Sequence, residues 1–165
     1  MNRGHRARIV VYYAFTLLCM VAIFVFSAQN ADSSQELSDG LLARLKALIA
    51  LLPPISGQGA EHDIRKYAHL LEFCMLGVSS ALLFGELRQN FRLAALRSHF
   101  GAFIAAWAFC IFYAATDELH QYFVPGRAAQ VSDVALDSCG ALVGCVIVFI
   151  IRLAIARAKE RDKNE

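Results

Sequence analysis

The sequence lacks the short motifs by which most enzyme classes are recognised. It contains no Gly-rich phosphate-binding loop, no nucleophile elbow and no H-E-x-x-H zinc motif. Its five cysteines form no C-x-x-C pair, which leaves redox motifs and cysteine metal clusters unsupported. It has no basic patch with interleaved aromatic residues, so no nucleic-acid partner is expected. These absences give the common enzyme classes no foothold, and they imply no cofactor and no metal.

Charged residues are also scarce. Asp, Glu, Lys and Arg make up 18% of the 165 residues, and hydrophobic residues make up 58%, more than a soluble domain usually carries. A helix that crosses a bilayer needs about 20 mostly apolar residues. The chain has four such runs, at residues 9–26, 67–83, 100–115 and 134–151. They predict an all-α integral membrane four-helix bundle, a single domain over residues 1–165 with helices at about 9–27, 65–87, 96–122 and 132–152.

Eleven of the 16 Lys and Arg residues lie at one side of this predicted bundle, and the other five, Arg44, Lys46, Arg65, Lys66 and Arg127, lie in the loops after the first and third helices. The eleven precede the first helix, separate the second from the third, and follow the fourth, as Arg3, Arg6, Arg8, Arg88, Arg92, Arg97, Arg152, Arg157, Lys159, Arg161 and Lys163. Because basic loops stay on the cytoplasmic side, both termini are predicted to be cytoplasmic. The first and third loops of this multi-pass membrane protein are then predicted to face outward. The first run is longer than the apolar core of a signal peptide and predicts an uncleaved anchor.

The first outward loop contains a second kind of segment. Between residues 38 and 52, Leu41, Leu45, Leu48 and Leu52 recur at helical spacing, which predicts an amphipathic helix. This helix either lies on the outer membrane surface or packs on the outer end of the bundle.

Polar residues interrupt the second and third helices at their outward ends. Arg65, His69 and Glu72 are spaced i, i+4 and i+7, so they share one face of the second helix. On the third helix a polar stripe runs through Tyr113, Asp117, His120 or Gln121, and Val124, with Glu118 about a quarter-turn away. A turn at Pro125-Gly126 then positions Arg127 to fold back over the carboxylates.

The fourth helix presents carboxylates on a face that is also suited to close packing. Ser132 or Asp133 is predicted to cap its first turn, and Asp137 lies one turn deeper in the membrane. Gly140 and Gly144 continue the same face as a G-x-x-x-G pair, which lets another helix approach closely. That neighbour is either a helix of the same bundle or a second copy of the chain in a homo-oligomer.

The predicted topology brings the outward ends of the second, third and fourth helices together. Ionisable groups in a membrane indicate a functional site by default. The candidate ligand-binding residues are Arg65, His69, Glu72, Asp117, Glu118, His120, Gln121, Arg127, Asp133 and Asp137. The candidates for acid or base chemistry are His69, Glu72, Asp117, Glu118 and His120.

These residues carry a resemblance to a known family. The ordered set R-K-x-x-H-x-x-E from residue 65, D-E-x-H-Q from 117, P-G-R from 125 and D-x-x-x-D-x-x-G from 133 resembles the VanZ-like family of small bacterial membrane proteins. The F-S-A-Q segment at residues 26–29 is similar to that family's stretch after its first helix. Two positions depart from the family pattern, where Phe73 replaces a usual Tyr and Ala28 replaces a second Ser, and both lose a hydroxyl group.

The resemblance implies a role in the cell envelope. Founding members of the family are associated with resistance to teicoplanin, a lipid-bearing glycopeptide that acts at the outer membrane face. One hypothesis is therefore an outward polar pocket in which Arg65 and Arg127 bind a lipophilic or lipid-linked ligand. A second is a membrane-embedded enzyme with a His base and a carboxylic acid, or with a metal at His69, Glu72, Asp117 and His120. The third is a structural membrane subunit. Membrane lipids are the remaining expected partners.

Overall fold

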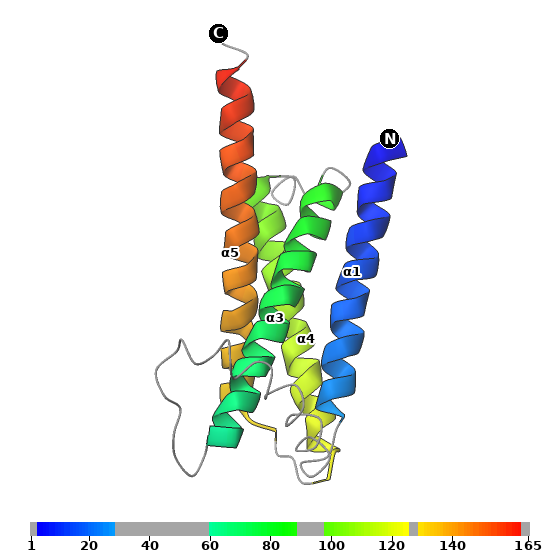
Figure 1. Cartoon of the computed structure of the whole chain (residues 1–165), viewed down its shortest axis with the longest axis vertical. Coiled ribbons are helices and arrows are strands. Elements are labelled where there is room, and N and C mark those ends of the chain that lie inside the picture. Colours follow the sequence, from blue (N-terminus) through cyan, green and yellow to red (C-terminus); the bar gives the residue numbers. More distant parts are fainter. Residues whose placement is uncertain (1–2, 29–59, 89–97, 126–128, 163–165) are drawn as a thin grey trace.

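The computed structural model describes residues 3–28, 60–88, 98–125 and 129–162, without the side chains of residues 60–65. The described chain forms four helices, α1 (Arg3–Ser27), α3 (Ala60–Leu87), α4 (His99–Tyr122) and α5 (Val131–Arg161), which run side by side along the long axis of the molecule (Figure 1). All four are long and apolar enough to cross a membrane, which confirms the predicted all-α, four-helix membrane architecture. The amphipathic helix predicted for residues 38–52 lies outside the described residues.

The helix bounds differ from those predicted. The first helix begins at residue 3 instead of 9, the second at 60 instead of 65, and the fourth continues to residue 161 instead of 152. Beyond Arg152, α5 reads LAIARAKER, a sequence rich in Ala, Arg, Lys and Glu, which are strong helix formers. Hydropathy therefore shows where the membrane segment ends, while the helix itself runs on.

The start of α5 also differs from the prediction. The helix begins at Val131, and the N-cap residue is Gln130, whose side chain makes no capping hydrogen bond. The prediction that Ser132 or Asp133 caps this helix is wrong, because both residues lie inside its first turn. At α4, by contrast, the Ser98 hydroxyl accepts a hydrogen bond from the backbone N–H of Gly101 at 2.8 Å and caps the helix.

The closest helix packing is between α3 and α5, and glycines make it possible. A Cβ atom on Gly140 or Gly144 would collide with backbone atoms of α3, and one on Gly77 would collide with the backbone of Ala141. The G-x-x-x-G face is thus occupied by α3 within the bundle. A homo-oligomer stays a prediction, and these two glycines are already covered in the monomer.

Apolar side chains cover much of the outside of the bundle. Val10, Leu18, Phe112, Val143 and Ile150 are all more than half exposed. Soluble monomers rarely expose so extensive an apolar surface to water, whereas the lipid tails of a membrane solvate such a surface favourably. The protein is therefore a multi-pass membrane protein. The N-terminal end of α1 and the C-terminal end of α5 lie at the same end of the molecule (Figure 1).

Candidate functional site

The opposite end gathers the end of α1, the first turns of α3, the end of α4 and the start of α5. Asp117, on α4, is only 2% exposed. Its Oδ2 atom accepts hydrogen bonds from the Ser27 hydroxyl at 2.8 Å and from the Gln121 side-chain amide at 2.9 Å. Its Oδ1 atom is buried and has no hydrogen-bond partner among the described residues. One carboxylate oxygen thus ties α1 to α4, and the other retains its capacity to accept a hydrogen bond.

Glu118 is buried like Asp117, although it lies about a quarter-turn from the predicted polar stripe of α4. One of its carboxylate oxygens accepts a hydrogen bond from the backbone N–H of Gln130 at 2.9 Å. Gln130 is the residue from which α5 starts, so the entry into α5 closes over this side of α4. Glu118 therefore lies at the α4–α5 junction, where its carboxylate satisfies a backbone donor at the start of a helix.

Asp137 lies on the α5 face that meets these acids and is only 2% exposed. Four other carboxyl groups lie close enough to act electrostatically on it, namely those of Asp117, Glu118, Asp133 and Glu72. We call these five side chains the carboxylate layer. Lys66 contributes a cation, with Nζ 3.1 Å from an oxygen of Asp133. Carboxylates this close together at low dielectric are stable only if protons, cations or hydrogen-bond donors compensate their charge.

Two histidines border the carboxylate layer from different helices. On α3, Nδ1 of His69 lies 3.7 Å from a carboxylate oxygen of Glu72, within ion-pair range but longer than a hydrogen bond. On α4, the His120 ring stacks on Phe24 of α1 with centroids 4.3 Å apart. The Nε2 atom of His120 is buried and has no hydrogen-bond partner among the described residues. The stack holds His120 in place while this nitrogen stays available.

The structure places eight of the ten candidate residues and brings them to one end of the bundle. The side chain of Arg65 and the whole of Arg127 lie outside the described residues. Sequence reasoning missed Ser27 as a partner of Asp117 and Gln130 as a partner of Glu118. The signal for Ser27 was a hydroxyl at the end of an apolar run. Gln130 donates through its backbone N–H, and its residue type therefore gives no signal for this hydrogen bond.

Chemically, the carboxylate layer offers five carboxyl groups, of which those of Asp117, Glu118 and Asp137 are buried. Two imidazoles and one ammonium group lie beside it. Within the described part of the chain, no group of three or more His, Cys, Asp or Glu side chains is arranged to hold a metal ion. The arrangement is suited to accept hydrogen bonds from a polar group and to exchange protons with it.

A comparison with protein families identifies the family of this chain. The family model VanZ/LLP1 matches residues 11–152, nearly the whole chain. No curated protein and no solved structure matches the chain.

Proposed function

The chain belongs to the VanZ/LLP1 family, and on that basis we propose that it is an envelope protein of the inner membrane. In this proposal its carboxylate layer faces outward and binds the polar head of a lipophilic or lipid-linked ligand. The observation that carries the proposal is a pair of buried atoms, Oδ1 of Asp117 and Nε2 of His120, which have no hydrogen-bond partner in the described part of the chain. A buried polar atom without a partner costs about 1–3 kcal/mol, and a donor group on a ligand would remove that cost at Asp117.

The surroundings of this pair suit a ligand with a lipid tail. Leu119, Tyr122 and Phe123, at the same end of α4, are all at least 60% exposed. Aromatic side chains at the end of a membrane helix favour the interface between headgroups and tails. A ligand whose polar group reached Asp117 from the membrane side would lay its apolar part along this rim.

Two arginines complete the proposed site. Arg65 and Arg127 remain predicted contacts for an anionic group of the ligand, because a planar guanidinium pairs well with phosphate or carboxylate. The position of Lys66, paired with Asp133, is consistent with a cation at this end of α3. In this proposal a lipid-bearing glycopeptide such as teicoplanin is one candidate ligand, and a lipid-linked envelope precursor is another.

The test is native mass spectrometry of the protein in mild detergent, first for co-purified lipid and then with added teicoplanin. Wild type is compared with an Asp117→Asn, His120→Gln double variant, and Asp162→Asn, at the exposed end of α5, is the matched control. We expect the double variant to lose co-purified lipid or to bind teicoplanin at least about tenfold more weakly, the factor of ~1.4 kcal/mol. The control keeps both.

A second arm separates the two parts of the ligand. Teicoplanin from which the acyl chain has been removed should bind more weakly than intact teicoplanin, because the apolar rim contributes to binding. If the double variant stays folded and retains lipid and teicoplanin as wild type does, the carboxylate layer is not the binding site.

The same two atoms support an alternative function as a membrane-embedded enzyme. The imidazole of His120 would act as the general base and Asp117 or Glu118 as its acid partner. The mass of the bound species distinguishes binding from catalysis. A bound lipid whose mass is the same in wild type and in a His120→Gln variant indicates binding alone, whereas an unconverted species that accumulates only in the variant indicates turnover.

A further inference from the structure

A second polar assembly lies at the other end of the bundle, away from the carboxylate layer. A cavity of about 900 Å³ opens there between the end of α3 and the helices α1 and α5. Four cationic side chains line it, together with one carboxylate: Arg8, Arg88, Arg152, Lys159 and Glu86. The positive-inside rule explains these basic residues only as markers of membrane orientation. Their convergence on one cavity needs a separate explanation.

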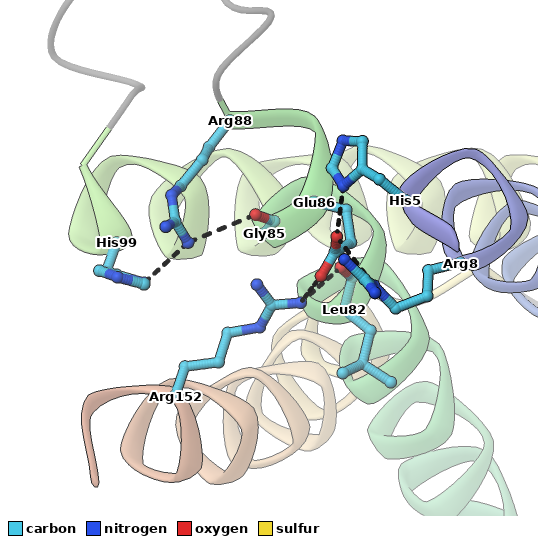
Figure 2. A network of polar contacts seen from close by, with 8 residues as sticks. All are labelled: His5, Arg8, Leu82, Gly85, Glu86, Arg88, His99 and Arg152. Carbon is cyan, nitrogen blue, oxygen red and sulfur yellow. Dashed lines mark hydrogen bonds and ion pairs between the residues drawn. The ribbon is translucent and has the colours of Figure 1, made fainter. Parts of the chain in front are cut away.

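Glu86 already contacts two arginines and one histidine. Its carboxylate lies 3.0 Å from Nδ1 of His5, 3.3 Å from Nε of Arg8 and 3.4 Å from Nη2 of Arg152, as Figure 2 shows. The carboxylate therefore sits at the centre of a group of basic side chains. One acid cannot neutralise all the cations of the cavity, so a net positive charge remains.

Arg88 is a cation of the cavity that forms no ion pair with a carboxylate of the described residues. Its Nη1 atom donates to the carbonyl of Gly85 at 3.4 Å and to Nδ1 of His99 at 3.1 Å (Figure 2). Burial lowers the pKa of Arg88, and the nearby Arg152 lowers it further, against the opposing effect of Glu86. Both effects mean that the positive charge is unfavourable where it lies. An anion beside Arg88 would stabilise it.

The fold makes a specific place for the second guanidinium. Arg152 donates to the carbonyl of Leu82 at 2.9 Å, and a Cβ atom on Gly85 would collide with its guanidinium. Gly85 thus allows the Arg152 group to lie flat against the last turn of α3. The hydrogen bonds described for Arg88 use only its Nη1 atom, and those described for Arg152 use only its Nη2 atom. Because a guanidinium has five N–H donors, both side chains retain donors for a ligand.

Part of the cavity wall is apolar. Tyr12 of α1, Leu82 of α3 and Ile151 and Ile155 of α5 line it, and both isoleucines are about half exposed. Within the described chain, α1 packs on α3 and α4 and makes no close backbone contact with α5. A basic end and an apolar side match the two parts of a phospholipid, and basic pockets between membrane helices hold anionic headgroups.

From these observations we propose that this basic cavity binds a phosphate group, with Arg88 and Arg152 as its principal donors. An anionic phospholipid supplies that group in the membrane, and its acyl chains lie along Ile151 and Ile155. This site is independent of the proposed function of the carboxylate layer, because the two lie at opposite ends of the bundle.

The experiment compares lipids that share acyl chains and differ in headgroup charge. The delipidated full chain is mixed in detergent with phosphatidylglycerol or with phosphatidylcholine, and bound lipid is counted by native mass spectrometry. We expect preferential retention of phosphatidylglycerol by wild type. In Arg88→Gln the retention should fall about tenfold, and in the control Arg157→Gln, which removes an exposed cation of α5 outside the cavity, it should stay as in wild type.

Two further variants guard against misfolding of Arg88→Gln. Gly85→Ala keeps every charge but displaces the Arg152 guanidinium, so it should also weaken retention of phosphatidylglycerol. Glu86→Gln removes the competing carboxylate, so it should strengthen that retention. A purely structural ion-pair network would give no gain of lipid in Glu86→Gln.

A third arm distinguishes the lipid from free phosphate as the source of the anion. Inorganic phosphate at millimolar concentration should displace phosphatidylglycerol only weakly, because it lacks contacts with the apolar wall. If phosphate alone binds, and its binding depends on Arg88, the site takes a soluble phosphate and the lipid assignment is overturned. Equal retention of both lipids without phosphate binding, or equal losses in Arg88→Gln and Arg157→Gln, overturns the proposal as a whole.

Discussion

Asp117 illustrates how a single residue can join two helices and also contribute to the proposed site. One oxygen of its carboxylate holds Ser27 and Gln121, so the charge is compensated by two donors from α1 and α4. The other oxygen is buried without a described partner. Removal of the whole side chain would therefore disturb both the helix contact and the binding capacity. Removal of a single donor separates the two effects.

Ser27→Ala tests the structural half of this arrangement. We expect the free energy of unfolding to fall by roughly 1 kcal/mol, because hydrogen bonds between membrane helices average about 0.6 and reach about 1.7 kcal/mol. Thermal unfolding in detergent, followed by circular dichroism, measures the change. Ser132→Ala is the matched control, since that exposed hydroxyl has only long contacts of 3.3 and 3.5 Å. Indistinguishable unfolding temperatures of the two variants would show that the Ser27–Asp117 bond contributes nothing.

At the scale of the elements, the contact between α3 and α5 sets the geometry of both polar ends. Gly140 meets the backbone of α3 near Leu70, and Gly144 meets it near Cys74. This contact lies between the carboxylate layer and the basic cavity along the helices. A change in the separation of α3 and α5 would therefore alter the geometry of both the carboxylate layer and the basic cavity.

Gly144→Ala tests the packing of these helices. The new methyl group would collide with the backbone of α3, and backbone cannot move aside as a flexible side chain can. We expect a loss of about 1–3 kcal/mol of stability, the usual cost of overpacking. The control is Gly4→Ala, where nothing lies within 4 Å of the added Cβ, and which should be neutral or slightly stabilising. Equal thermal unfolding of both variants would contradict the close packing.

For the whole molecule, charge is divided between the two ends of an apolar bundle. The carboxylate layer is at one end, and the basic cavity is at the other. The N-terminal end of α1 and the C-terminal end of α5 lie at the end of the basic cavity (Figure 1). The positive-inside rule then predicts that the basic end faces the cytoplasm. The same rule would place the carboxylate layer outside, where the proposed ligand acts.

Reporter fusions test this orientation. Green fluorescent protein fused after Glu165 should fluoresce, and alkaline phosphatase at the same place should be inactive, because its disulfides form only outside the cytoplasm. Phosphatase inserted between Ser56 and Gly57 should be active. The opposite pattern would place the carboxylate layer on the cytoplasmic side and remove an outward-facing ligand from consideration.

The sequence by itself determined the number and type of the membrane helices and the family, since apolar runs and short motifs are local properties of the chain. It also predicted that Asp117, Asp133 and Asp137 share one end, because consecutive membrane helices alternate in direction. Only the tertiary structure decided which atoms pair. The Ser27 hydroxyl donates a hydrogen bond to Asp117, and Glu118 accepts one from the backbone at the start of α5. Arg8, Arg88 and Arg152 line one cavity. Such pairings depend on the rotation of each helix about its axis and on side-chain rotamers, which helical periodicity leaves open.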